Sequence, residues 1–459
     1  MTEAPTPATR VLARTPRPEA SAIATALADA FLAADAWTAP HLVDAGSFVL
    51  GARRRWLPRV VDDVMVDFVR APVDSPRLLI TVIGDSPAFR AAIEKADAAR
   101  TPIRIHHHVV ATTRSREPAA GLPRIDDIAA LAKLLELTDG QLAWFADTKR
   151  WNRRARPGPL HHYRYEWRSR PGRVPRLLEV PEERLRRVQR RLLERVLGLI
   201  PANDAAHGFM QGRSAVTGAA RHVGADIVVS VDLTTFFARV SAGRVYGTLR
   251  QSGYSESVAH TIAGVCTSAV PPRVLAAMPP GGTPEERFAL RRALAANHLP
   301  QGAPSSPMIA NLAVRRLDSR LTGWAAAVDA AYTRYADDLT FSGGPSLAAR
   351  PDAFIRGVRR IVEGEGHSLN ERKTRIRRQA TRQAVTGIIV NERLNLVRGD
   401  YDRLKAIIHN CILHGPSSQN RAGVADFRAH LRGRISWVES LNAQRGARLR
   451  AEFARIVWA

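Results

Sequence analysis

The sequence contains little cysteine, little lysine and no long apolar run, and each shortage excludes a class of protein. Cys266 and Cys411 are the only cysteines in 459 residues, too few for a disulfide scaffold or a cysteine-based zinc site, and they suit a reducing cytoplasm. No stretch approaches the roughly 18 uninterrupted apolar residues that a membrane-spanning helix requires. The first residues are rich in Pro and lack the apolar core of a secretory signal. We therefore expect a cytoplasmic location and no membrane partner.

Basic residues dominate the charge. Lys occupies five positions, so that Arg supplies 63 of the 68 basic residues, and the net charge is +25. A surface of this kind attracts polyanions, and the planar guanidinium group suits phosphates and exposed bases. A coding bias toward Arg and Ala and a membrane-surface partner are the competing explanations. The length predicts two to three domains, and we expect a nucleic-acid partner.

Three aspartates form the most informative pattern. The run from Tyr332 to Ser342 places aromatic and β-branched residues on both sides of Ala336-Asp337-Asp338, which predicts a β-hairpin with these residues at its turn. The β-branched run 227–232 ends in Asp232 and predicts a buried central strand. Carboxylates gathered on one sheet are typical of sites that hold two Mg²⁺ ions roughly 3.5–4 Å apart for phosphoryl transfer. A bare Asp-Asp pair is more often a solvated turn. The third carboxylate, Asp232 at the end of a predicted central strand, favours the metal site over that alternative.

At these residues the sequence resembles reverse transcriptases. Tyr335-Ala336-Asp337-Asp338 is similar to palm motif C of that family, and the segment from Asp232 to Phe237 is similar to motif A. The resemblance implies an α+β right-hand polymerase fold in which the three aspartates bind two Mg²⁺ ions. It also places Phe237 beneath the sugar of the incoming nucleotide, where a bulky ring excludes a 2′-OH, and we expect Phe236 in the core.

Further segments match other motifs of the family. Leu299-Pro300-Gln301-Gly302 resembles motif B, which implies that Gln301 and Gly302 touch the template or the nascent base pair. The segment 366–374 resembles motif D and makes Lys373 a candidate general acid toward pyrophosphate, since Lys donates a proton more readily than Arg. Val385-Thr386-Gly387 resembles motif E. In the fingers, a Gly-rich segment that begins at His207 implies a triphosphate contact, and the candidate residues are Arg213, Arg176 and Arg173.

Within reverse transcriptases, the sequence most resembles the bacterial retron enzymes. The residues that carry this resemblance are 333–343, His207-Gly208-Phe209 and Val385-Thr386-Gly387, while the retron Asn-Ala-x-x-His element is present as Gly218-Ala219-Ala220-Arg221-His222, with Gly in place of Asn. The resemblance implies an RNA-directed DNA polymerase that uses dNTPs to copy part of a structured non-coding RNA into single-stranded DNA. It also implies a role in anti-phage defence with a separate effector protein. An intron-encoded or diversity-generating reverse transcriptase and a catalytically idle RNA-binding scaffold are the alternatives. The chain leaves little room for the maturase region of intron enzymes.

The remaining patterns predict the organisation of the chain. The expected parts are a disordered tail over 1–18, an N-terminal α/β or helical accessory extension over 19–120, fingers over 125–225, a palm over 226–398 and a helical thumb over 399–459. In the extension we expect strands over 78–83 and 103–110 and a helix over 88–98. Three successive His at 106–108 would alternate between the faces of a strand and rarely share a metal. The alternating aromatic and basic residues of 161–168 predict either base stacking or an aromatic core face, and the Arg-rich helix near 184–196 predicts a solvated or a phosphate-tracking face.

Overall fold

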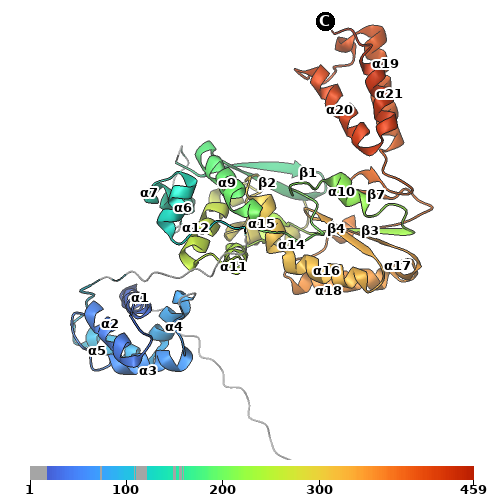
Figure 1. Ribbon diagram of the computed structural model, residues 1–459. Helices are drawn as coiled ribbons and strands as arrows, with labels where there is room; N and C mark the ends of the chain where they lie inside the picture. The colour runs from blue at the N-terminus through green and yellow to red at the C-terminus, as the bar shows by residue number, and fades with distance from the viewer. Residues whose placement is uncertain are drawn as a thin grey trace, which may run out of the picture. The chain divides into compact units, whose positions relative to one another are not determined.

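The computed structural model describes residues 18–72, 75–107, 109, 121–147, 151–154, 158 and 160–458, and the chain divides into two compact units (Figure 1). The tail predicted over 1–18 lies outside the described residues except for residue 18. Within the described ranges, no helix combines the length and the apolarity needed to cross a membrane.

The first unit consists of helices α1 to α5 together with residues 124–133 and 249–260. The bounds of its helices are α1 Pro18–Leu32, α2 Ala39–Val49, α3 Leu57–Asp67, α4 Pro76–Asp85 and α5 Pro87–Ala98. The helix predicted over 88–98 is therefore present. The strand predicted over 78–83 is wrong, because these residues belong to α4. Pro76 occupies its first turn, and Leu79 and Ile83, four residues apart on one face, are fully buried.

The strand predicted over 103–110 is also wrong over its described part, because residues 101–107 form no regular element. The backbone N–H groups of His106 and His107 both donate to the carbonyl oxygen of Val49, and the His107 ring stacks on Phe48 with the centroids 4.3 Å apart. His106 and His107 are exposed, and His108 lies outside the described residues. Of the two alternatives for the extension, the structure has the helical one.

The second unit begins with short helices and a long hairpin. The bounds are α7 Asp139–Ala146, α8 Trp151–Arg154, β1 Tyr163–Arg170, β2 Arg173–Pro181 and α9 Glu183–Arg195, and α6 Ile128–Leu135 spans the border between the units. The aromatic face of β1 belongs to the core rather than to a stacking surface. Tyr163 is buried and its hydroxyl group accepts a hydrogen bond from Gln189, while the indole N–H of Trp167 donates to the carbonyl of Val274. The prediction of base stacking by residues 161–168 is therefore wrong for these rings.

A four-stranded sheet in the order β4-β5-β3-β6 lies at the centre of the second unit (Figure 1). Its strands are β3 Ile227–Asp232, β4 Ala331–Tyr335, β5 Asp338–Gly343 and β6 Arg375–Arg378, and all neighbouring strands are antiparallel. As predicted, β3 is a buried central strand that ends in Asp232. Helices α16 Arg315–Ala326 and α18 Pro351–Gly364 cover one face of the sheet and contact each other.

The other elements of the second unit surround this sheet or follow it. They are η1 Leu197–Leu199, α10 Ala215–Ala220, η2 Phe237–Arg239, α11 Ala242–Gln251, α12 Glu256–Cys266, α13 Pro272–Ala276, α14 Pro284–Ala295, α15 Ser306–Ala313, α17 Pro345–Ala349, η3 Glu371–Lys373, β7 Ala384–Val385 and β8 Ile388–Ile389, of which α11 and α12 also contribute to the first unit. The chain continues into α19 Arg398–His414, η4 Pro416–Ser418, α20 Phe427–Leu441 and α21 Ala443–Phe453. Helices α19, α20 and α21 share a core that includes Leu404, Leu431 and Leu449.

Candidate active site

The three aspartates of the sequence pattern meet at one edge of the central sheet. Asp232, the last residue of β3, lies directly opposite Asp338, the first residue of β5. Ala336 and Asp337 form the two-residue connection between β4 and β5, and Ala336 adopts a left-handed backbone with φ 56°. The backbone N–H of Leu233 donates to the carbonyl of Asp337 over 2.9 Å, which ties the end of β3 to this connection. We call Ala336, Asp337 and Asp338 the catalytic corner.

Lys373 neutralises part of this negative charge. Its ammonium group lies 2.7 and 2.6 Å from the two carboxylate oxygens of Asp232, whose side chain is almost fully buried. Burial and the neighbouring Asp337 raise the pKa of Asp232, while Lys373 lowers it. Desolvation, Asp337 and Asp232 raise the pKa of the Asp338 carboxyl group to about 6, although Asp338 as a residue is exposed. Carboxylates this close therefore need a cation, and the ammonium group supplies one.

These groups lie on the wall of a cavity of about 850 Å³. Eight of the ten residues predicted for the site line it, namely Asp232, Asp337, Asp338, Lys373, Arg173, Arg176, Phe237 and Gln301. Arg170 lines it too and was not predicted. Arg170 lies opposite Arg173 at the tip of the β1–β2 hairpin, and the charges of Asp232 and Asp337 reach its guanidinium group. The pKa of Arg170 is lowered by burial and by the other two arginines.

The segment 299–302 is fixed against strand β2. The backbone N–H of Glu179 donates to the carbonyl oxygen of Gln301 over 2.9 Å. The next residue, Gly302, has a φ of 135°, and a Cβ atom at this position would lie 2.8 Å from the carbonyl oxygen of Glu179. Gly302 thus permits a close approach of two backbones but does not itself line the cavity. Beneath it, His298 and Glu179 form a fully buried pair 2.9 Å apart. Burial lowers the pKa of His298, but the Glu179 carboxylate outweighs it and the pKa is raised overall.

Arg213 is not among the residues that line the cavity. Its Nη1 donates to the carbonyl oxygens of Asn203, Asp204 and Ala206 at 2.9–3.0 Å, and its Nη2 donates to the Asp204 carboxylate at 2.8 Å. The guanidinium group therefore binds the preceding loop, residues 203–206, in this structure. The triphosphate contact assigned to Arg213 stays a prediction.

A buried polar network supports the catalytic corner from behind. Arg334 on β4 makes a two-point contact with Asp318 at 2.8 and 2.7 Å, and both side chains are fully buried. The same guanidinium group donates to Asn311 at 2.9 Å and to the carbonyl of Ala336 at 3.1 Å. Asn311 donates in turn to the carbonyl of Gly208, where a Cβ atom would lie 2.9 Å from the Ala336 nitrogen. The corner is thereby held by charge-assisted hydrogen bonds and by one close backbone contact.

His222, the last residue of the Gly218–His222 element, is also buried beneath the hairpin. Its two ring nitrogens lie 2.7 Å from the hydroxyl oxygens of Ser342 and Thr333. Burial and the neighbouring His207 and Arg221 lower the pKa of His222 to about 4. The ring therefore joins β4 and β5 as a neutral group inside the sheet.

The carboxylates suit hard divalent cations. Aspartate oxygens are the ligands that Mg²⁺ prefers, and Mg²⁺ is usually held by one or two carboxylates together with substrate phosphates and water. Within the described ranges no group of three or more His, Cys, Asp or Glu side chains has the spacing of a complete metal site. The residues present therefore fit a site that substrate oxygens complete rather than a closed protein cage.

Comparison with known proteins shows which proteins this chain is similar to. Residues 171–390 match the family described as reverse transcriptase (RNA-dependent DNA polymerase). Retron Mx65 reverse transcriptase from Myxococcus xanthus is 37% identical over 303 residues, which cover 64% of this chain and 65% of the relative. The chain is therefore similar to retron reverse transcriptases over about two thirds of its length. The predicted α+β right-hand polymerase fold is confirmed, because the matched region contains strand β2 and the whole of the central sheet.

Other proteins similar to this chain include two further retron reverse transcriptases. Retron Mx162 reverse transcriptase from Myxococcus xanthus is 36% identical over 64% of this chain and 61% of its own length, and retron Ec86 reverse transcriptase from Escherichia coli is 29% identical over 61% and 76%. The chain thus spans less than two thirds of the length of the two Myxococcus relatives. Among solved structures, a foamy viral protease-reverse transcriptase in complex with double-stranded DNA is 14% identical with a TM-score of 0.32, covering 66% of this chain and 45% of that chain. The Candida albicans telomerase is 10% identical with a TM-score of 0.28, covering 71% and 48%.

Proposed function

We propose that this protein is an active reverse transcriptase, an RNA-directed DNA polymerase that copies part of a cognate structured non-coding RNA into single-stranded DNA. The observation that supports this most is the meeting of Asp232, Asp337 and Asp338 on the wall of one large cavity. Arginines line the same cavity, and the chain as a whole has a net charge of +25. Negative groups for cations beside positive groups for phosphates are what nucleotidyl transfer requires.

The proposed cofactor is a pair of Mg²⁺ ions held by Asp232 and Asp337, with Asp338 beside them. When bound, these ions would lower the pKa of the primer hydroxyl group and neutralise charge on the triphosphate. Arg170, Arg173 and Arg176 line the same cavity and would receive the triphosphate, since guanidinium groups bind phosphate oxygens in pairs.

The other residues of the cavity have separate proposed roles. Phe237 would contact the sugar and exclude a 2′-OH, and Gln301 would touch the base pair that forms. Lys373 must leave Asp232 before it donates a proton to the departing pyrophosphate, because the ion pair occupies its ammonium group. Gly302 would keep the 299–302 segment against β2.

The boundaries of the parts belong to the same proposal. Fingers over 125–225, palm over 226–398 and thumb over 399–459 would grip the template and primer, and residues 19–120 would bind RNA or a partner. A cytoplasmic location fits the two cysteines, which are free and buried. The structured RNA, its DNA product, dNTPs and a separate effector protein are the proposed partners, and anti-phage defence is the proposed setting.

Primer extension tests the activity. Purified protein with dNTPs and Mg²⁺ should extend a primer annealed to an RNA template, and chelation of the metal should stop extension. Sequencing of nucleic acid that copurifies with the protein tests the retron assignment. Branched RNA–DNA supports it, intron RNA would assign the protein to the intron-encoded enzymes, and RNA without attached DNA, together with no extension, would indicate an idle scaffold.

A further inference from the structure

Two exposed tryptophans lie next to each other on the second unit, away from the residues of the large cavity. Trp144 lies in the last turn of helix α7, and Trp151 begins helix α8. Their ring centroids are 4.9 Å apart at 52°, and the residues are 37% and 47% exposed. Neither tryptophan lines the cavity that contains the aspartates. Two large rings exposed together are unusual on a soluble surface and indicate a binding site.

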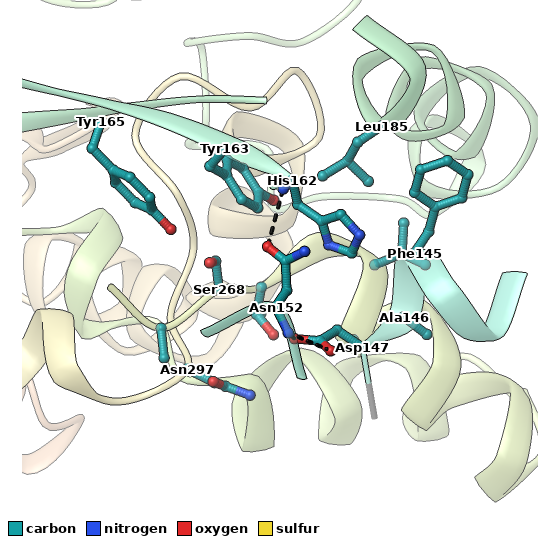
Figure 2. Close-up of a pocket in the computed structure, with 14 residues that line it drawn as sticks. Phe145, Ala146, Asp147, Asn152, His162, Tyr163, Tyr165, Leu185, Ser268 and Asn297 are labelled. Carbon is teal, nitrogen blue, oxygen red and sulfur yellow. Dashed lines mark hydrogen bonds between the residues drawn. The ribbon is translucent and has the colours of Figure 1, made fainter. Parts of the chain in front are cut away.

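Polar groups near the two tryptophans hold this part of the chain, and Figure 2 shows Asp147, Asn152 and His162 among them. The Asp147 carboxylate accepts hydrogen bonds from the backbone N–H groups of Trp151 at 2.8 Å and Asn152 at 3.1 Å. Asn152 donates to the carbonyl of Leu160 and accepts from the backbone N–H of His162, so that it links α8 to β1. The rings are therefore presented by a rigid frame.

His162 completes the frame under the pair. Its ring meets Trp144 edge to face with the centroids 5.4 Å apart, and it also contacts Phe145 at 5.8 Å. His162 is buried and lines a small polar cavity of about 40 Å³, and burial and His161 lower its pKa to about 4. A neutral ring beneath Trp144 leaves the outer face of the pair available for contact.

One arginine lies close to the residue that follows Trp144, and it belongs to an Arg-rich side of helix α9. The guanidinium group of Arg184 lies 5.8 Å from the centroid of the Phe145 ring, adjacent in sequence to Trp144. Arg184, Arg187 and Arg190 are exposed at three-residue intervals on α9 and so lie along one side of the helix. In the part of the chain that the structure describes, no carboxylate lies within ion-pair distance of Arg184 or Arg190, and the Arg187–Glu183 contact is long at 3.9 Å. These cations are thus available to phosphates.

The charge of the chain favours a nucleic acid over a protein as the occupant. Residues 121–459 contain 53 basic and 30 acidic residues, whereas residues 1–120 contain 15 and 13. The net charge of +23 on 121–459 therefore lies in the part of the sequence that contains the pair. Aromatic faces beside arginines bind single strands, because bases stack on the rings while guanidinium groups hold the backbone.

We propose that the tryptophan pair, with Arg184, Arg187 and Arg190, binds unpaired nucleotides of a single strand. Two or more successive bases would stack on Trp144 and Trp151, and the arginines of α9 would follow the phosphates. The site is separate from the polymerase cavity and does not require catalysis. RNA template and single-stranded DNA product present the same chemistry, and the two are separated by the choice of probe.

Binding of short labelled strands tests this site. Fluorescence anisotropy of 12-nucleotide oligouridine and oligothymidine is measured with the full chain in EDTA, at several salt concentrations. Replacing both rings (Trp144→Ala with Trp151→Ala) should raise Kd for the bound strand between about tenfold and a thousandfold without changing the salt dependence. The variant with Arg184→Gln and Arg190→Gln should instead lower the slope of log K against log salt by about 0.7 for each arginine. Phe substitutions of the two tryptophans should retain most of the affinity.

Leu199→Ala is the matched control, since Leu199 is an exposed apolar side chain of the second unit that does not line the large cavity, and its Kd should equal that of the unaltered chain. Loss of affinity for oligouridine alone assigns the site to RNA, and loss for both probes assigns it to single strands of either kind. A Kd within twofold of the unaltered chain for both probes overturns the proposal and leaves a protein as the occupant. Extension of a preformed primer–template duplex should be unchanged in the tryptophan variants. Failure of extension by the unaltered chain would count against the proposed polymerase but not against this site.

Discussion

Removal of one partner from the buried Arg334–Asp318 pair should destabilise the protein strongly. The Asp318 carboxylate accepts from Nε and Nη2 of Arg334 and from the hydroxyl group of Tyr332 at 2.9 Å, and neither member of the pair is exposed. Breaking a buried ion pair from one side costs about 3–5 kcal/mol, because the remaining charge stays buried without a partner. We therefore expect Arg334→Met and Asp318→Leu each to lower the free energy of unfolding by about that amount.

The double variant, Arg334→Met with Asp318→Leu, separates the effect of the pair on stability from its effect on the position of the catalytic corner. Replacing both charges with apolar groups should recover much of the lost stability, since no lone charge remains. It should not recover nucleotide addition, because the Ala336 carbonyl still lacks the donor that Arg334 provides. Urea denaturation gives the stability, and single-nucleotide extension with saturating primer–template gives the rate. Arg455→Met, in an exposed pair with Glu452, is the control and should change stability by less than about 1 kcal/mol. An Arg334→Met variant that loses less than about 1 kcal/mol would refute this reasoning, as would a double variant with full activity.

Three further predictions concern the same unit. The pKa of His222 is about 4 in the folded protein, below its usual value of about 6.5, so the unfolded chain binds more protons between these pH values. The free energy of unfolding should therefore rise by up to about 3 kcal/mol from pH 4 to pH 7. Denaturation experiments on His222→Gln should show a flatter dependence on pH. Gly208→Ala should slow primer extension, because the added methyl group would lie 2.9 Å from the backbone nitrogen of Ala336. Gly433→Ala is the control and should not slow it, because no atom lies within 4 Å of the added methyl group. Equal rates for the two variants would argue against the close contact. Lys373→Met should slow extension about 10²–10⁴-fold and Lys373→Arg should restore the ion pair without restoring the rate, so a fully active Arg variant would exclude proton donation by Lys373.

Local patterns were sufficient to predict the centre of the fold. The β-branched run that ends in Asp232 and the aromatic flanks of the catalytic corner each specify a strand without tertiary information, and antiparallel pairing then brings the three carboxylates together. The predictions failed where the same composition suits two structures. The apolar run 78–83 could form a buried strand or a helix, and burial of Leu79 and Ile83 on one helical face decided between them.

Contacts between distant segments could not be predicted. Arg213 directly follows Gly212 and Arg170 lies two residues before Gly172, but only the register of β1 against β2 places Arg170 on the cavity wall. The Arg170-Pro171-Gly172-Arg173 turn contained that signal, because pairing across it makes the two arginines neighbours. The partners of Arg334 lie 16 and 23 residues earlier in the chain and have no spacing rule that connects them. Charge in the sequence therefore indicated phosphate binding but not which arginines provide it.

The rate of single-nucleotide addition in carboxylate variants tests the central claim most directly. Asp232→Asn and Asp337→Asn are compared with the control Asp402→Asn, whose exposed carboxylate pairs with Arg398 on helix α19. We expect each site variant to be slower by about a thousandfold or more with RNA binding retained, because several kcal/mol of charge stabilisation would be lost, while the control stays within a few-fold of the unaltered chain. Rates near that of the unaltered chain in either site variant would contradict the assignment of the three aspartates to nucleotidyl transfer.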